Sequence, residues 1–402
     1  MLRLIVRKEM LGNLYNYKFS IIIILSTILI LASIFVMYRD YCLTMENYEI
    51  LQQESEAIAI IRPTPLAIFA KGLDENLCRS YERGSSGKIG VSRKQQSVNN
   101  LFKLFTAPDL LYIIKVILSL CAMLFAFDIV SGEKETGTLR QSLSNRLKRP
   151  ILIIGKWIGG FISFILPFFV VVLLGTILVT LSPMVDINAQ NWAKLGLFLL
   201  SSVIYLAVFF SLGLLISCLT HRSSTSLIIS LFLWATLVFL IPNLGNILAR
   251  QLVQIPTVQQ LELKREQSWI KQLFEIGRLD GSQRRELVKR NTIENDKLTE
   301  DYRNRFNRLV TVSQNITRFS PAAAFTFLAT DIMGTGMAEE RRLKRAVLQY
   351  LKDRDDKMLD YQRSSVKEVL GQGGLSNCLI LILFNTLFFA SSYVVFLRYD
   401  VR

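Results

Sequence analysis

Six long apolar segments alternate with polar segments along the chain. Each is close to or longer than the roughly 20 residues that a helix needs to cross the hydrocarbon core of a bilayer. They are residues 19–37, 108–129, 152–181, 193–219, 224–244 and 375–397. The first is too long for the apolar region of a cleavable signal peptide, and no small-residue cleavage site follows it. The pattern predicts an all-α integral membrane protein with six transmembrane helices.

The short polar segments differ in charge. Lys and Arg occur in residues 1–18, in 130–151, in the turn at 221–222 and in the tail 398–402, whereas 182–192 contains neither. Because short loops rich in Lys and Arg stay in the cytoplasm, both termini and 130–151 are expected there. Residues 38–107 and 245–374 then lie outside, and long translocated segments follow this rule poorly.

Residues 1–18 can form a helix that lies in the cytoplasmic interface of the membrane. Four apolar residues can share one face of it and three basic residues lie off that face: Leu2, Ile5, Met10 and Leu14, and Arg3, Arg7 and Lys8. Periodicity alone leaves open the alternative that this segment is only the cytoplasmic start of the first span.

Residues 245–374 are predicted to form a helical extracytoplasmic domain. Apolar residues recur at helical spacing around Leu298 and Tyr302, and again around Leu343 and Val347. Such stripes could bind an exported protein or a lipid, but more often they are the packing surface between helices. The stretch 320–333 is apolar enough to dip into the outer leaflet, and too short for a seventh span.

The chain is basic, with a formal net charge of +15. In a membrane protein such an excess favours contact of cytoplasmic loops with anionic lipid headgroups. No basic block forms the compact patch typical of nucleic-acid binding. Membrane lipid is therefore an expected partner, and nucleic acid is not.

The sequence offers little material for catalysis. His221 is the only histidine, so histidine-based metal sites and catalytic triads are not expected. No G-x-x-x-x-G-K-[ST] phosphate loop occurs, so the chain is not expected to bind ATP or another cofactor, or to be an enzyme. Cys42 and Cys78 share the first outer segment and could form a disulfide in an oxidising compartment.

A dense charged stretch, FDIVSGEKETGTLR at 127–140, lies between the second and third apolar segments. Glu133 and Glu135 suit the N-terminus of a short helix, and Gly137 permits a left-handed backbone turn. A short charged helix at the base of a membrane domain can dock a partner. Composition alone favours the alternative of an ordinary solvated loop.

The order of residues changes this interpretation. Residues 127–160 closely resemble the cytoplasmic loop of ABC type-2 permeases, the membrane subunits of a class of ATP-binding-cassette exporters. The matching positions are Asp128, Glu133, Glu135, Gly137, Thr138, Leu139, Arg140, Leu143, Ser144, Arg149, Ile153, Ile154, Gly155 and Lys156. The stretch 320–336 is similar to permeases of gliding motility and of nitrous-oxide-reductase maturation, which carry a large outer domain.

The resemblance implies a machine of several subunits in the bacterial inner membrane. Two permease copies, or one copy and a close paralogue, would pair above two cytoplasmic ABC ATPases, which carry the ATP and Mg. The coupling helix that docks into the ATPase would comprise Glu133, Lys134, Glu135, Thr136, Gly137, Thr138, Leu139 and Arg140. His221, Arg222 and Ser223 would form a second, smaller contact.

Two functions remain open. The chain could be the permease of an ATP-driven exporter. Alternatively, ATP-driven motion of the outer domain could act on a periplasmic protein without transport, which is called mechanotransmission. The size of the segment 245–374 raises the weight of the second function.

Overall fold

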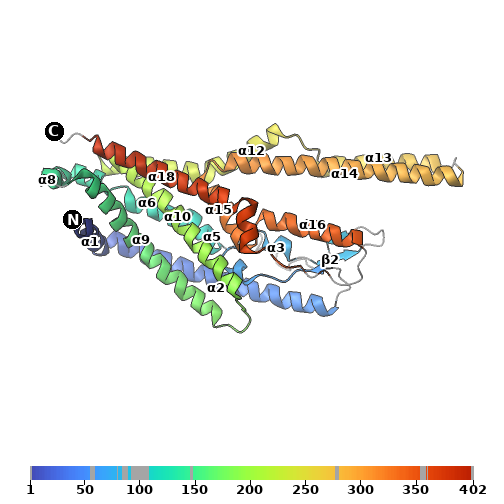
Figure 1. The fold of residues 1–402 in the computed structure, drawn as a ribbon, viewed down its shortest axis with the longest axis horizontal. Coiled ribbons are helices and arrows are strands. Elements are labelled where there is room, and N and C mark those ends of the chain that lie inside the picture. The colour runs from blue at the N-terminus through green and yellow to red at the C-terminus, as the bar shows by residue number, and fades with distance from the viewer. Residues whose placement is uncertain are drawn as a thin grey trace. The chain divides into compact units, whose positions relative to one another are not determined.

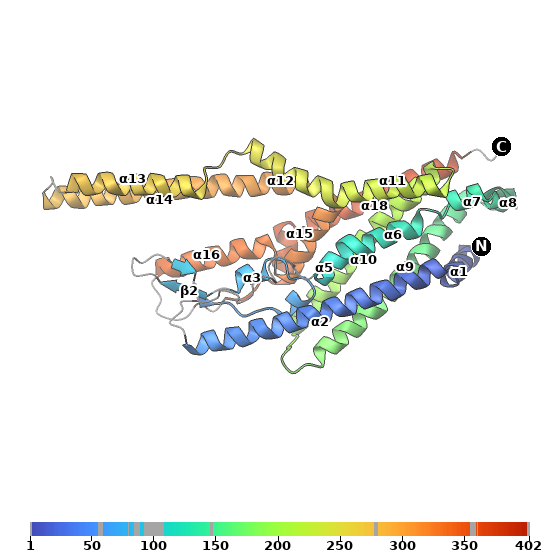
Figure 2. The same cartoon turned by 180° about the vertical axis from the view of Figure 1, so that it is seen from behind.

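The computed structural model describes residues 2–54, 59–78, 80–83, 89–91, 108–144, 148–276, 280–353, 359 and 361–399. The chain divides into two compact units (Figures 1 and 2). Unit 1 comprises residues 1–238 and 321–402, and unit 2 comprises residues 239–320. The predicted outer segment 245–374 is thus shared between the two units.

Six helices are long and apolar enough to cross a membrane, and each overlaps one of the predicted spans. Within the residues that the structure describes, they are Phe19–Gln53, Leu110–Glu135, Arg149–Thr180, Ala189–Leu219, Ser223–Leu252 and Leu375–Leu397. The predicted all-α membrane fold is confirmed. The first helix extends well beyond the predicted span, because α2 runs from Tyr17 to Glu54.

Unit 1 contains most of the helices. In chain order its longer helices are α1 (Leu2–Leu14), α2, α6 (Ser119–Ala126), α9 (Arg149–Thr180), α10 (Ala189–Leu219), α11 (Ser223–Ala235), α15 (Pro321–Met333), α16 (Met337–Asp353) and α18 (Leu375–Leu397). Its shorter helices are η1 (Pro65–Ile68), α3 (Asp74–Leu77), α5 (Leu110–Tyr112), α7 (Ser131–Glu135), α8 (Thr138–Ser144) and α17 (Val366–Val369). Short π-helical segments follow α5, α11 and α17: η3 (Ile113–Leu118), η4 (Thr236–Leu240) and η5 (Leu370–Gly374).

Helix α10 forms the centre of unit 1 and packs against α6, α15 and α18. Its Tyr205 ring stacks on Phe325 of α15, with ring centroids 4.3 Å apart. The Tyr205 hydroxyl donates a hydrogen bond to the Lys115 carbonyl of η3 at 2.7 Å. The apolar stretch 320–333 therefore contributes a buried helix to the bundle core, where the sequence suggested a segment in the outer leaflet.

Helix α1 packs closely on α9 at two glycines. A Cβ atom on Gly155 would lie 2.7 Å from Ile5, and one on Gly159 would lie 2.8 Å from the Cβ of Glu9. Small residues four apart on a helix allow such an approach of backbones. The seam holds α1 across the start of α9.

The opposite end of unit 1 carries a small sheet. Strands β1 (Ala59–Ile60), β2 (Ser80–Arg83) and β3 (Ile89–Val91) pair antiparallel in the order β1-β2-β3, an element that the sequence did not indicate. Nearby, Leu343 and Val347 of α16 pack with Ile61 and Leu77. The apolar stripe at Leu343 and Val347 is therefore a packing surface inside the protein, the more common of the two roles considered for it.

The disulfide considered between Cys42 and Cys78 is not formed, because both are free cysteines. Cys78 instead donates to the Asp74 carboxylate at 3.4 Å, and Asp74 also pairs with Arg363 at 2.7 Å. Burial and the neighbouring Asp74 raise the pKa of the Cys78 thiol, which disfavours the reactive thiolate.

Unit 2 contains α12 (Ile241–Leu252), α13 (Val258–Ile276) and α14 (Gly281–Thr317). Helices α13 and α14 lie side by side as a hairpin (Figure 2). Asp280 begins the 37-residue α14 with a capping box, in which Asp280 and Gln283 satisfy each other's backbone N–H groups. Helix α12 packs against the other end of α14.

Candidate functional site

The charged stretch lies at the end of unit 1 that also carries α1, as Figure 2 shows for α1, α7 and α8. We call this end, comprising α1, α7, α8, the turn 220–222 and the last residues of α18, the α7 end. Arg149 at the start of α9 donates to the Leu397 carbonyl of α18 at 2.8 Å. The starts and ends of several spans therefore meet here.

Helix α7 is anchored to α10 by hydrogen bonds from backbone N–H groups to one side chain of α10. The N–H groups of Val130 and Ser131, which begin α7, both donate to the Ser217 hydroxyl at 2.9 Å. The Ser131 hydroxyl in turn donates to the Phe127 carbonyl. One hydroxyl of α10 thus satisfies two N–H groups that have no partner within a helix this short.

Gly137 separates α7 from α8. Its φ of +74° is in the left-handed region, and no atom lies within 4 Å of where its Cβ would be. This is the left-handed turn that the sequence suggested. After the turn, Leu139 is only 1% exposed and packs with Ile5, Val130 and Leu152. Leu139 therefore anchors α8 to the bundle and is not available to a partner.

Lys156 of α9 is the most deeply buried charge at the α7 end. Its side chain is 2% exposed, and its ammonium group pairs with Glu133 of α7 at 2.7 Å and with Glu9 of α1 at 3.0 Å. A buried ammonium group needs such partners, because an isolated buried charge is very costly. The second carboxylate oxygen of Glu133 is buried and has no hydrogen-bond partner.

Lys134 caps the end of α10. Its ammonium group donates to the carbonyl oxygens of Cys218 and Thr220, and it lies 4.8 Å from the centre of the Tyr399 ring. The last carbonyls of a helix have no partner within the helix and carry partial negative charge, so a cation there is stabilising.

Glu135 binds the start of α11. Its carboxylate accepts a hydrogen bond from the Ser223 N–H at 3.0 Å. An anion at a helix N-terminus is stabilised by the unpaired N–H groups and the helix dipole. The predicted coupling helix and the predicted second contact are therefore joined here, through Ser223. His221 and Arg222 are exposed beside this bond.

The predicted docking residues thus differ in their surroundings. Glu133 bonds to α9, which bonds in turn to α1. Lys134 bonds to the end of α10, and Glu135 bonds to the start of α11. Glu133 and Lys134 are half-buried, whereas Glu135, Thr136, Gly137, Thr138 and Arg140 are exposed. Sequence reasoning missed the roles of Lys156 and Glu9. The signal was present: a lysine at the end of an apolar segment requires an acid, and Glu9 is the only acid in the N-terminal 18 residues.

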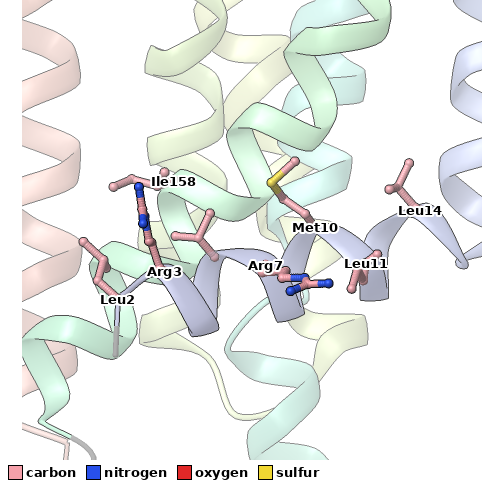
Figure 3. A pocket seen from close by; sticks show the side chains of 8 residues that line it. Leu2, Arg3, Arg7, Met10, Leu11, Leu14 and Ile158 are labelled. Atoms are coloured by element: carbon pink, nitrogen blue, oxygen red, sulfur yellow. The ribbon is translucent and has the colours of Figure 1, made fainter.

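A groove of about 370 Å³ runs along α1 at this end (Figure 3). It is lined by Leu2, Arg3, Val6, Arg7, Met10, Leu11, Leu14 and Ile158. Ile5 is not among the residues that line the groove: it packs on Gly155, which Leu2 also approaches. Arg3 and Arg7 instead share the groove with the apolar residues.

These features match a known class of membrane protein. Residues 3–401 match the family model of the ABC-2 family transporter protein. The chain therefore belongs to the ABC-2 family and is a permease, the multi-pass membrane subunit of an ABC transporter that works with an ABC ATPase subunit. None of the curated proteins compared with the chain matches it. The similarity to gliding-motility and nitrous-oxide-reductase-maturation permeases stays a prediction.

We predict that the substitution Lys156→Met lowers the stability of the permease. It leaves Glu9 and Glu133 as uncompensated carboxylates close together, and removing one partner of a buried ion pair costs about 3–5 kcal/mol. Thermal unfolding in detergent measures the loss. The triple variant Glu9→Gln, Lys156→Met, Glu133→Gln removes all three charges and should recover part of it. An unchanged unfolding temperature in Lys156→Met would contradict the prediction.

Proposed function

We propose that this permease couples ATP hydrolysis by a separate cytoplasmic ATPase to export of an unidentified substrate across a bacterial inner membrane. The observation that carries the proposal is the bonding of α7. Its three successive charges bond to α9, α10 and α11, and Lys156 of α9 bonds in turn to α1, so a displacement of α7 would be passed to all four helices.

The α7 end supports a division of roles within the charged stretch. Exposed residues after the turn, Thr138 and Arg140 among them, would contact the ATPase. Glu133, Lys134 and Glu135 would pass its motion into the spans through the bonds described above. The exposed His221 and Arg222 would form the second contact, adjacent to the Glu135–Ser223 bond.

The assembly that follows contains two permeases and two ATPases, with both permease termini in the cytoplasm. The second permease copy would be identical or a close paralogue. ATP and Mg would bind to the ATPase subunits, and the permease would perform no chemistry. The basic, short segments at the α7 end support this orientation.

Two variants should separate docking from transmission. Arg140→Glu reverses an exposed charge and should weaken ATPase binding strongly, since losing one partner of an interfacial charge pair can cost about 2–5 kcal/mol. Lys134→Met removes the cap of α10 and should leave ATPase binding intact while permease-dependent ATP turnover falls. Affinity pull-down and ATP turnover of the reconstituted complex measure the two effects.

Arg285→Glu is the control, because it reverses an equally exposed charge on α14, outside the α7 end, and should change neither quantity. Normal ATPase binding in Arg140→Glu would show that α8 is not the docking element. Normal coupling in Lys134→Met would show that α7 does not transmit motion through α10.

Mechanotransmission is the second candidate function, and unit 2 favours it. Its 37-residue helix α14 pairs with α13 to form a long helical hairpin, which could transmit motion over its length. A short connection between two spans would be enough for a permease that only forms a channel. In this function, closure of the ATPases would change how the two copies of unit 2 are oriented relative to each other.

We predict that spin labels placed at residue 286, which is exposed on α14, report that motion. Electron-spin distance measurements on the reconstituted complex should give different distance distributions with and without ATP. Identical distributions in the two states, in a complex that hydrolyses ATP, would exclude mechanotransmission and leave export.

A further inference from the structure

The groove along α1 is apolar along most of its length, and its two charged residues are both arginines. Arg3 and Arg7 lie one helical turn apart, and both are exposed. The only acid of α1, Glu9, is engaged with Lys156. The groove therefore combines an apolar surface with positive charge and no acidic lining residue.

We propose that this groove binds one anionic phospholipid. An acyl chain would lie along Met10, Leu11 and Leu14, and the phosphate would be bound by Arg3 and Arg7, which both line the groove. Arginine pairs well with phosphate because its guanidinium group presents several donors in a fixed plane. The bound lipid holds α1 against α9, and so keeps Glu9 beside Lys156 at the α7 end.

The test uses the purified full-length permease without the ATPase, so that its outcome does not depend on coupling. Native mass spectrometry measures binding of phosphatidylglycerol and phosphatidylcholine. The wild type should prefer phosphatidylglycerol, and Arg3→Gln and Arg7→Gln should each weaken its binding about fivefold, the effect of one basic residue near an anionic surface. Lys8→Gln removes an equal charge outside the groove and should have no effect.

Unfolding temperatures of the lipid-free variants check that the fold is intact. Equal binding of the two lipids would overturn the proposal, as would an equal loss in Lys8→Gln. Inorganic phosphate should not displace the lipid at millimolar concentration. Displacement would show that the site binds a free anion, which also overturns it.

In the helical hairpin of unit 2, α13 and α14 meet through polar side chains. Helix α13 faces α14 with polar residues: Arg265 donates to the Thr299 hydroxyl at 2.6 Å, and Ser268 and Gln272 follow at helical spacing. In the same hairpin the Asn295 side-chain oxygen is buried without a hydrogen-bond partner. Among the α13 side chains at positions 258–275, Leu261 alone is buried. The hairpin is therefore held by a polar seam.

The apolar residues of α13 lie on its other sides. Leu263, Trp269, Ile270, Leu273 and Phe274 are 48–77% exposed. Leu263, Ile270 and Phe274 form a stripe, because their spacing of seven and four residues places them on one face. Together with Val258, six large apolar side chains of this 19-residue helix are exposed, and contiguous exposed apolar patches mark interaction surfaces.

The charges beside the stripe indicate what covers it. By helical position, Glu262 and Glu266 lie along one edge of the stripe. Lys264 and Lys271 lie along the other, with Glu275 beside them at the C-terminal end of α13. When two copies pair in parallel about a two-fold axis, the acidic edge of each faces the basic edge of its partner, as at the flanks of a coiled coil. Antiparallel pairing would bring like charges together. A membrane surface is disfavoured by the acidic edge.

We infer that α13 is the pairing surface between two copies of this chain, which join their hairpins in parallel into a four-helix arrangement. The inference rests on the proposed assembly of two permeases. In a symmetric pair, residues on the axis contact their own counterparts. Ile270 is at the centre of the stripe and is the position that should meet itself.

A photo-crosslinking amino acid at position 270 of the full-length permease tests this. Irradiation should give a crosslinked dimer whose joined peptides, identified by mass spectrometry, both contain α13. The same group at position 272, which faces α14, should give crosslinks only within one chain. Glu262→Lys with Glu266→Lys should reduce the dimer band at least severalfold, and adding Lys264→Glu with Lys271→Glu should restore it.

The mass of the complex before irradiation shows whether the permease is a dimer, so a failure of hairpin pairing can be told from a failure of the proposed assembly. A dimeric complex whose residue 270 crosslinks to another protein, to lipid or to nothing would overturn the pairing of the hairpins alone. A monomeric complex would overturn both. Crosslinking unaffected by the charge reversals would overturn the parallel arrangement.

Discussion

The α7 end depends on one interaction, the pairing of the Lys156 ammonium group with two carboxylates. The ammonium group is buried between these carboxylates, which belong to helices far apart in the sequence, Glu9 of α1 and Glu133 of α7. A charge with so little contact with water tolerates only small displacements of its partners. The position of α7 is therefore fixed relative to α1 and α9, although α7 contains only five residues and would not be stable as an isolated helix.

The neighbouring bonds extend this constraint to the rest of the bundle. Ser217 and Lys134 attach α7 to α10, the central helix, and Glu135 attaches it to α11. Each bond involves a helix terminus, where backbone groups lack partners within the helix. The short helix therefore completes the ends of its neighbours, and they in turn hold it in place.

The sequence was sufficient to predict some features because they depend on local pattern. Apolar length indicated the six spans, and the turn at Gly137 followed from residue type. The sequence could not show which way the charges point. Glu133 and Glu135 suggested a docking surface. Glu133 is half-buried against Lys156, and Glu135 is exposed but accepts a bond from Ser223; both partners are more than 20 residues away in the sequence. In the same way, the residues 321–333 are apolar enough for lipid contact, and only the aromatic stacking of Phe325 on Tyr205 shows that they are core.

The glycine seam between α1 and α9 has a consequence for the exchange of parts among related permeases. Ile5 and Glu9 fit against Gly155 and Gly159 because no side chain intervenes, and this fit brings Glu9 to Lys156. Residues 127–140 therefore do not form a self-sufficient module. A chimaera that takes this loop from a relative contains the equivalent of Glu133, but Lys156 and Glu9 come from the recipient chain. The loop, the start of α9 and the first 14 residues should therefore be exchanged together.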